Sequence, residues 1–137
     1  MGNCNHIDQA RHNEEVCNHL SKYAGFSDWI ITTAFYAATH YIRGKILPFT
    51  EIDKSGKNIT FNDFESFYNA KRFAHMGRHE FTYQFLVKYH PKIADDFKIL
   101  KGLSTDARYI NYQMGSKNSN NARALLRNIR NYCISKK

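Results

Sequence analysis

The sequence holds only two prolines, three cysteines and no long apolar run, and each shortage excludes a class of structure. Cys4, Cys17 and Cys133 are an odd number at no recognisable spacing, which argues against a disulfide framework and fits a reducing compartment. The longest largely apolar stretch, Trp29 to Thr39, is about half of the ~20 residues that a membrane helix needs. Residues 1–6 contain no apolar segment that could act as a secretory signal. The sequence therefore predicts a cytoplasmic protein without a membrane partner.

Acidic residues are also in short supply, with 12 against 20 lysines and arginines, which leaves a net charge of +8. Positive potential concentrates phosphate-bearing ligands, so this excess favours anionic partners, nucleic acid first. Part of this positive charge follows a regular pattern, because Arg123, Arg127 and Arg130 recur at helical spacing opposite an apolar stripe. A merely solvated basic face explains that order at least as well. The C-terminal arginines therefore support a nucleic-acid interpretation without establishing it.

Histidine and cysteine crowd the N-terminal segment, but in no order that is typical of a metal site. The crowded residues are Cys4, His6, His12, Cys17 and His19. Their C-x-H and seven-residue spacings match no common zinc pattern. We therefore predict no metal and no cofactor.

Helical periods and turn signals predict an all-α fold, an antiparallel bundle of four to five helices in one domain, residues 1–137. The first helix is expected from Asp8 to Tyr23, and the second from a cap at Ser27 or Asp28 to a point before Pro48. A third begins between residues 69 and 78 and ends at 89, a fourth starts at Pro91, and a fifth follows a linker at 115–120. The expected core residues are Ile31, Ala34, Phe35, Ala38, Phe81, Phe85, Phe97, Leu100, Leu125 and Ile129.

The longest connection runs from Phe49 to Tyr68 and shows no sustained period of either kind. We predict a mobile loop there, with at most one short helical turn. No strand-like alternation is visible elsewhere, so no sheet is expected.

The helix over residues 28–41 is predicted to carry two different faces. One is an apolar stripe that faces the core, formed by Ile31, Ala34, Phe35, Ala38 and Ile42. The other mixes aromatic rings with a histidine and an arginine, and it consists of Trp29, Thr33, Tyr36, His40 and Arg43. Such a face is not typical of a solvated helix, so we expect it to meet another helix or a ligand.

Three segments in a fixed order carry a resemblance to a known family. They are Ala34-Phe35-Tyr36-Ala37-Ala38-Thr39-His40, then His75 and Arg78 at the opening of the next long helix, then Ser104-Thr105-Asp106-Ala107-Arg108-Tyr109. In this order the chain resembles the HEPN superfamily of small all-α nucleotide-handling proteins, over roughly Glu15 to Tyr112. The resemblance implies a helical homodimer with a composite cleft for RNA or a nucleotide.

Superfamily members that cleave RNA carry an arginine and a histidine a few residues apart, and the matching pair here is Arg72 and His79. A metal-free ribonuclease needs a base for the 2′-hydroxyl, an acid for the leaving oxygen and a cation on the phosphate. On a continuous helix the two residues would share a face, ~10 Å apart. The resemblance thus implies a metal-independent endoribonuclease of toxin or antiviral-defence type, with Arg72 and His79 as catalytic residues.

A second pattern keeps other functions open. The branch that the tryptophan-containing helix and the S-x-D-A-R-Y segment resemble most carries a His-x-x-Arg pair, here His75 and Arg78. Two arginines and two histidines lie between residues 72 and 79, so the spacing of Arg72 and His79 also arises rather easily by chance. The alternatives are a non-catalytic module that binds RNA or a nucleotide, and a domain that binds a protein of antitoxin type.

The predicted anion-binding residues are His40, His75, Arg78 and Arg108, and we expect them to line one positively charged concavity with Arg72 and His79. A structural alternative pairs Arg78 with Asp106 and joins His75 or His40 to Tyr36 or Tyr109 by hydrogen bonds. So much positive charge is costly to bury without an anion, which favours a bound phosphate.

The expected homodimer would use the face formed by Trp29, Tyr36 and His40, or place it at the rim of a shared cleft. Exposed aromatic residues opposite a core face suggest a surface that is covered in the assembly. Two-fold dimers are also the commonest assemblies.

Overall fold

The computed structural model describes residues 5–72, 75–110 and 115–135, and most of these residues are helical. In these ranges the elements are α1 (His6–Leu20), α2 (Ser27–Ile46), β1 (Phe49–Ile52), β2 (Asn58–Phe61), α3 (Phe64–Lys71), α4 (Arg78–Tyr89), α5 (Pro91–Thr105) and α6 (Ser116–Ile134). A short π-helix, η1 (Asp106–Ile110), continues α5. The predicted helical class is confirmed. The described chain nevertheless has six α-helices rather than four or five, and it contains a small sheet.

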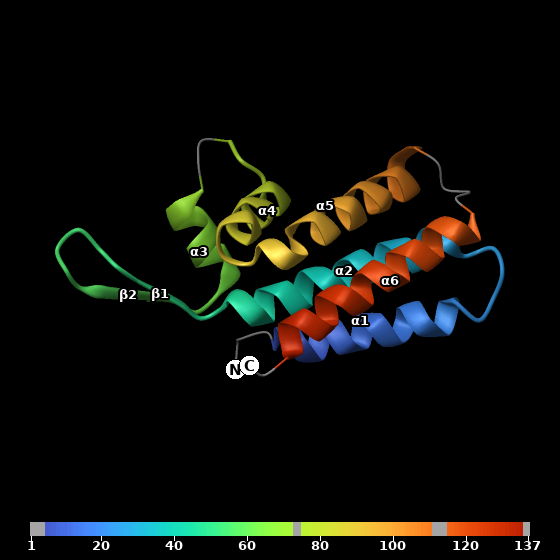
Figure 1. Ribbon diagram of the computed structural model, residues 1–137, viewed down its shortest axis with the longest axis horizontal. Helices are drawn as coiled ribbons and strands as arrows, with labels where there is room; N and C mark the ends of the chain where they lie inside the picture. The colour runs from blue at the N-terminus through green and yellow to red at the C-terminus, as the bar shows by residue number, and fades with distance from the viewer. Residues whose placement is uncertain (1–4, 73–74, 111–114, 136–137) are drawn as a thin grey trace.

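The four long helices α1, α2, α5 and α6 form the body of the structure (Figure 1). In the figure, α1 and α5 run in one direction and α2 and α6 in the other. α2 contacts α1, α5 and α6, so it lies at the centre and is apolar on most of its circumference. Along the described ranges, no helix combines the length and the apolar character that crossing a membrane requires.

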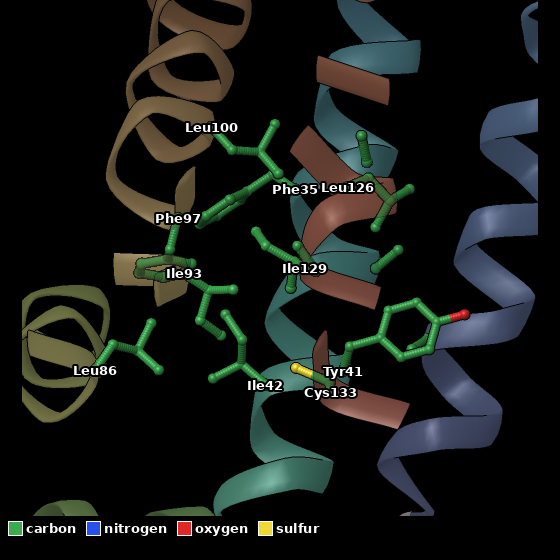
Figure 2. Packing of buried hydrophobic residues seen from close by; sticks show 14 of the residues in the cluster. Phe35, Tyr41, Ile42, Leu86, Ile93, Phe97, Leu100, Leu126, Ile129 and Cys133 are labelled. Atoms are coloured by element: carbon green, nitrogen blue, oxygen red, sulfur yellow. The ribbon is translucent and has the colours of Figure 1, made fainter. Parts of the chain in front are cut away.

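The core lies between α2, α5 and α6, where Phe35 and Phe97 meet with ring centroids 5.7 Å apart (Figure 2). Every predicted core residue is buried except Leu125, which is half-buried. Its neighbour Leu126 is 2% exposed and takes the core position. The buried stripe of α6 therefore runs through Ala122, Leu126, Ile129 and Cys133.

A polar group ties α1, α2 and α6 together inside the bundle. The buried carboxylate of Glu14 accepts a hydrogen bond from the Tyr41 hydroxyl at 2.7 Å and from Nη1 of Arg130 at 2.6 Å. Figure 2 shows the hydroxyl of Tyr41 directed toward α1. Burial and this hydrogen bond raise the pKa of Tyr41, which keeps the phenol protonated.

Replacing Glu14 by alanine is expected to lower the free energy of unfolding by about 2 to 4 kcal/mol. The change leaves the Tyr41 hydroxyl, on a side chain only 1% exposed, without its acceptor. Urea denaturation measures the effect, and Glu15→Ala, at the exposed neighbouring position, is the control. We expect the control to stay within about 0.5 kcal/mol of the wild type. Equal losses in both variants would show that the buried group contributes nothing special.

Several helix ends differ from the prediction. The side chain of Asn5 caps α1 by accepting from the Asp8 amide at 3.1 Å, so the helix begins at His6 rather than at Asp8. α1 ends at Leu20 rather than at Tyr23. α2 begins at Ser27 without a side-chain cap. Residues 116–120, predicted as a linker, belong to α6, whereas the start of α5 at Pro91 is confirmed.

The loop predicted for residues 49–68 is wrong, because this segment forms a hairpin and most of α3. β1 pairs antiparallel with β2, with Phe49 opposite Phe61. In the turn, the carboxylate of Asp53 accepts from the amides of Ser55 and Lys57, and Gly56 adopts a φ of +89° that suits glycine. In Figure 1 the hairpin extends away from the bundle beside α3.

Candidate anion-binding site

His79 lies in the first turn of α4 and points into the fold, where it is half-buried. Its ring packs against Phe35 of α2 at 4.9 Å between centroids and lies 6.4 Å from Phe97 of α5. Its Nδ1 atom is buried and has no hydrogen-bond partner among the described residues. The imidazole is thus held by apolar packing between three helices.

The charges of several positive side chains act on this imidazole. Burial is the main cause that lowers the pKa of His79 to about 4, and the charges of nearby cations lower it further. Those cations are Arg43 on α2, Lys101 on α5, Arg108 on η1 and Arg78 on α4. At neutral pH the imidazole is therefore uncharged, and the positive charge that acts on it belongs to these four side chains, of which Arg78 is paired with Glu65.

Aromatic rings hold two of these cations in place. The guanidinium of Arg43 lies 4.0 Å from the ring centroid of Phe64. Nη1 of Arg108 donates to the hydroxyl of Tyr36 at 3.0 Å. Arg108, Tyr36 and Trp29 also line a cavity of about 290 Å³ between α2 and η1. The S-x-D-A-R-Y segment thus contributes an arginine that is directed back to α2.

Arg78 and Arg72 form a second, exposed group around Tyr68. Arg78 makes a bidentate pair with Glu65, at 2.7 and 2.8 Å, instead of the pair with Asp106 that we considered. The guanidinium groups of Arg78 and Arg72 lie 4.9 and 5.3 Å from the centroid of the same tyrosine ring. The structure therefore brings these two arginines together on the outer side of α3 and α4.

Arg72 and His79 do not lie on one continuous helix, because α4 begins at Arg78, within the expected range of 69–78. α3 ends at Lys71, and both Arg72 and the N-cap Gly77 have extended backbones, with ψ of 155° and 169°. The linker between the helices holds the exposed His75, while Phe73 and Ala74 lie outside the described residues. The catalytic roles of Arg72 and His79 stay a prediction.

His40 belongs to another neighbourhood. Its ring stacks on His6 of α1 with centroids 5.2 Å apart, and the two Nδ1 atoms are 3.0 Å apart. Burial first, then the charges of His6 and Arg43, lower the pKa of His40 to about 4. The considered hydrogen bond from His40 to Tyr36 is replaced by these contacts, and the side chain of Tyr109 lies outside the described part.

The structure places the predicted residues in different surroundings. The charges of Arg78 and Arg108 lower the pKa of His79, and the charge of Arg43 lowers the pKa of both His79 and His40. Arg72 lies with Arg78 around Tyr68, and His75 is exposed in the linker before α4. Lys101 and Arg43 were missed as site residues. The signal for Arg43 was present, since it follows His40 by three residues on the same stripe. Whether all six predicted residues line one concavity stays a prediction.

Within the described ranges, no group of three or more histidine, cysteine or carboxylate side chains could hold a metal ion. Cys17 and Cys133 are buried free thiols. Cys4, which belongs to the N-terminal crowd, lies outside the described residues.

The free energy of unfolding is expected to fall as the pH drops from about 7 to 4. The pKa values of His79 and His40 are about 4 in the folded state and near 6.5 in the unfolded chain. Above pH 6.5 neither state holds the proton, so nothing changes. Between pH 6.5 and 4 the unfolded chain binds protons that the folded state refuses, and stability is lost until about pH 4.

We expect a loss of roughly 1 kcal/mol per histidine at pH 5, after allowance for solvent screening at half-buried sites. Urea denaturation at pH 7, 6 and 5 measures it. His79→Gln should make the pH dependence shallower, whereas His12→Gln, at an exposed position on α1, should leave it as it is. Identical pH dependence in the wild type and His79→Gln would contradict the assignment.

Comparison of the chain with models of known protein families, with curated proteins and with solved structures finds no match. The function must therefore be argued from the side chains of the site.

Proposed function

We propose that the chain is an HEPN-like protein that binds RNA through the cationic side chains around His79. The observation that carries the proposal is the half-buried imidazole of His79, packed on Phe35, whose pKa is lowered first by burial and then by the charges of four nearby cations, Arg43, Lys101, Arg108 and Arg78. Arg78 is already paired with Glu65, but like charges near one another repel, and a phosphate group beside Arg43, Lys101 and Arg108 relieves that repulsion. Arginine also matches phosphate with two parallel donors.

The resemblance of the three segments to the HEPN superfamily supports the same ligand class. The mostly helical fold agrees with it, and so does the net charge of +8. Two of the three segments contribute cations to the site, because the charges of Arg78 and Arg108 both lower the pKa of His79.

Salt dependence tests this proposal. Anisotropy of a labelled single-stranded RNA should show binding that weakens steadily as the salt concentration rises. Each neutralised phosphate contributes about −0.7 to the slope of log K against log salt for a single strand, so three contacts predict a slope near −2. Absence of binding at low salt, or binding that salt does not affect, would contradict the proposal.

The second candidate function is a metal-independent endoribonuclease. It is favoured by the neutral state of His79 at pH 7, because only a neutral imidazole can accept a proton. His79 would take the proton of the 2′-hydroxyl as this oxygen attacks phosphorus, and Arg72 would bind the phosphate. The bond to the 5′-oxygen breaks, and the exposed His75 or water supplies the proton to the leaving group. The products are a 2′,3′-cyclic phosphate and a 5′-hydroxyl.

We also propose a homodimer through the α2 surface that carries Trp29 and Tyr36. These side chains are 55% and 40% exposed on one face of the helix, which is unusual for tryptophan. His40 does not extend this surface, because it is half-buried against His6. Light scattering at tens of micromolar should give the dimer mass and Trp29→Ser the monomer mass. A monomeric wild type would contradict the homodimer, and the surface would then be assigned to the binding of another protein, of the antitoxin type.

A further inference from the structure

A cavity of about 550 Å³ lies between the hairpin, α3 and α4, apart from the group around His79. Aromatic rings from three elements line it: Phe49 of β1, Phe67 of α3, and Phe81, Phe85 and Tyr89 of α4. The rings contact one another, with 4.6 Å between the centroids of Phe85 and Tyr89 and 5.0 Å between those of Phe49 and Phe67. The volume falls within the ~300–1,000 Å³ range of small-molecule sites.

Charged side chains accompany this aromatic lining. Lys71 lines the cavity and pairs with Glu51 of β1 at 2.9 Å. Lys88 also lines it, and its Nζ lies 5.2 Å from the ring centroid of Tyr89. Phe67, Phe81 and Phe85 are buried against one another, so the cavity offers the partly exposed rings of Phe49 and Tyr89 together with two amines and one carboxylate.

We infer that this cavity accepts one base of a single-stranded RNA, while the neighbouring phosphates contact Lys71 and Lys88. Every base presents a π-face, so aromatic side chains bind bases by stacking without reading their sequence. The carboxylate of Glu51 can accept hydrogen bonds from the amino groups of a base. The inference rests on the proposed RNA-binding function and names the part of the ligand that this second site holds.

The exposed arginines are connected to the cavity through residues that line it. Lys71 directly precedes Arg72, which lies with Arg78 around Tyr68. Met76 lines the cavity, and its carbonyl accepts the hydroxyl of Tyr68. A strand bound to the two arginines therefore passes the mouth of the cavity. Two of the four cations along this path are paired, Lys71 with Glu51 and Arg78 with Glu65. The path still carries a net positive charge, which favours a polyanion over an uncharged apolar peptide as the occupant.

A fluorescent base tests the inference. Single-stranded RNA that carries 2-aminopurine should lose fluorescence on binding, because the base stacks on the rings. Tyr89→Leu keeps an apolar side chain but removes a ring, so it should lower both the quenching and the affinity, the latter about tenfold. The salt dependence of binding should not change, because no charge is removed. Tyr23→Leu, an exposed tyrosine outside this cavity, is the matched control and should behave like the wild type.

Gln84→Glu covers the case in which Tyr89→Leu fails to fold. Gln84 is exposed on α4 and lines the cavity, so a carboxylate there should repel the strand and weaken binding severalfold. RNA binding without quenching, and unchanged in both variants, would overturn the base site and leave the proposed function standing. The base site would also be overturned if the variants changed the molecular mass measured by light scattering but not the RNA affinity. The cavity would then be a contact between two copies of the chain.

Failure of the wild type to bind RNA would instead overturn the proposed function. Adenosine monophosphate then tests the cavity by itself in NMR spectra. Shifts of the ring signals of Tyr89 and Phe49 would support the base site, and unchanged signals would overturn it as well.

Discussion

Reversing the charges of Lys101 and Arg108 is expected to weaken the binding of single-stranded RNA about 100-fold at 0.1 M salt. Both cations lower the pKa of His79, and Arg108 is exposed on η1 while Lys101 is half-buried on α5. The double variant Lys101→Glu/Arg108→Glu removes two partners of phosphate and adds two charges that repel it. The slope of log K against log salt should fall by about 1 to 2. Anisotropy titrations at several salt concentrations measure both quantities.

A matched control separates the site from the net charge. Lys54→Glu/Lys57→Glu changes the net charge by the same amount, but both lysines lie at the exposed turn of the hairpin. We expect this variant to bind RNA within about threefold of the wild type, because surface charges beyond a Debye length are largely screened. Equal losses in the two double variants would show that overall charge, and no particular site, attracts the RNA.

Under the ribonuclease proposal, His79→Gln should lower RNA cleavage in the presence of EDTA by at least about 100-fold, since it removes the general base. Arg72→Ala should cause a similar loss while the thermal unfolding temperature stays nearly unchanged, because Arg72 is exposed. Gel analysis of cyclic-phosphate products measures the rate, and His12→Gln is the control. Cleavage that survives in both variants would be assigned to a contaminant. A wild type that binds RNA but does not cleave it would contradict the ribonuclease proposal and leave RNA binding as the only proposed function.

The long helices could be predicted from the sequence because each repeats its apolar residues over several turns. α2, α5 and α6 show this period, and the start at Pro91 is set by a residue that suits a first turn. β1 and β2 have only four residues each, which is too short for a reliable alternation. Their formation depends on side-chain packing against another element, since Phe49 and Phe61 both lie against Phe67 of α3. Such tertiary contacts cannot be read from local propensity.

The candidate site, like the fold, could be predicted only in part. The mixed face of α2 was visible as a stripe, and its Arg43 does act on His79. The sequence leaves the start of this helix open between residues 69 and 78, and α4 begins at Arg78, which puts Arg72 outside the helix that carries His79. Neighbouring residues of a helix also point in different directions, which sends His79 inward and Arg78 outward to Glu65. That pairing depends on α3, an element that the sequence analysis assigned mainly to a loop.

The most direct test of the phosphate site is an NMR titration of the His79 imidazole, with and without saturating single-stranded RNA. In the free protein its pKa should be about 4. A bound phosphate offsets the surrounding positive charges, so the pKa of His79 should rise by roughly 1 to 2 pH units in the complex. His12, on the exposed side of α1, serves as the internal control. A His79 pKa that is the same in the free and the RNA-bound protein would contradict the proposed site.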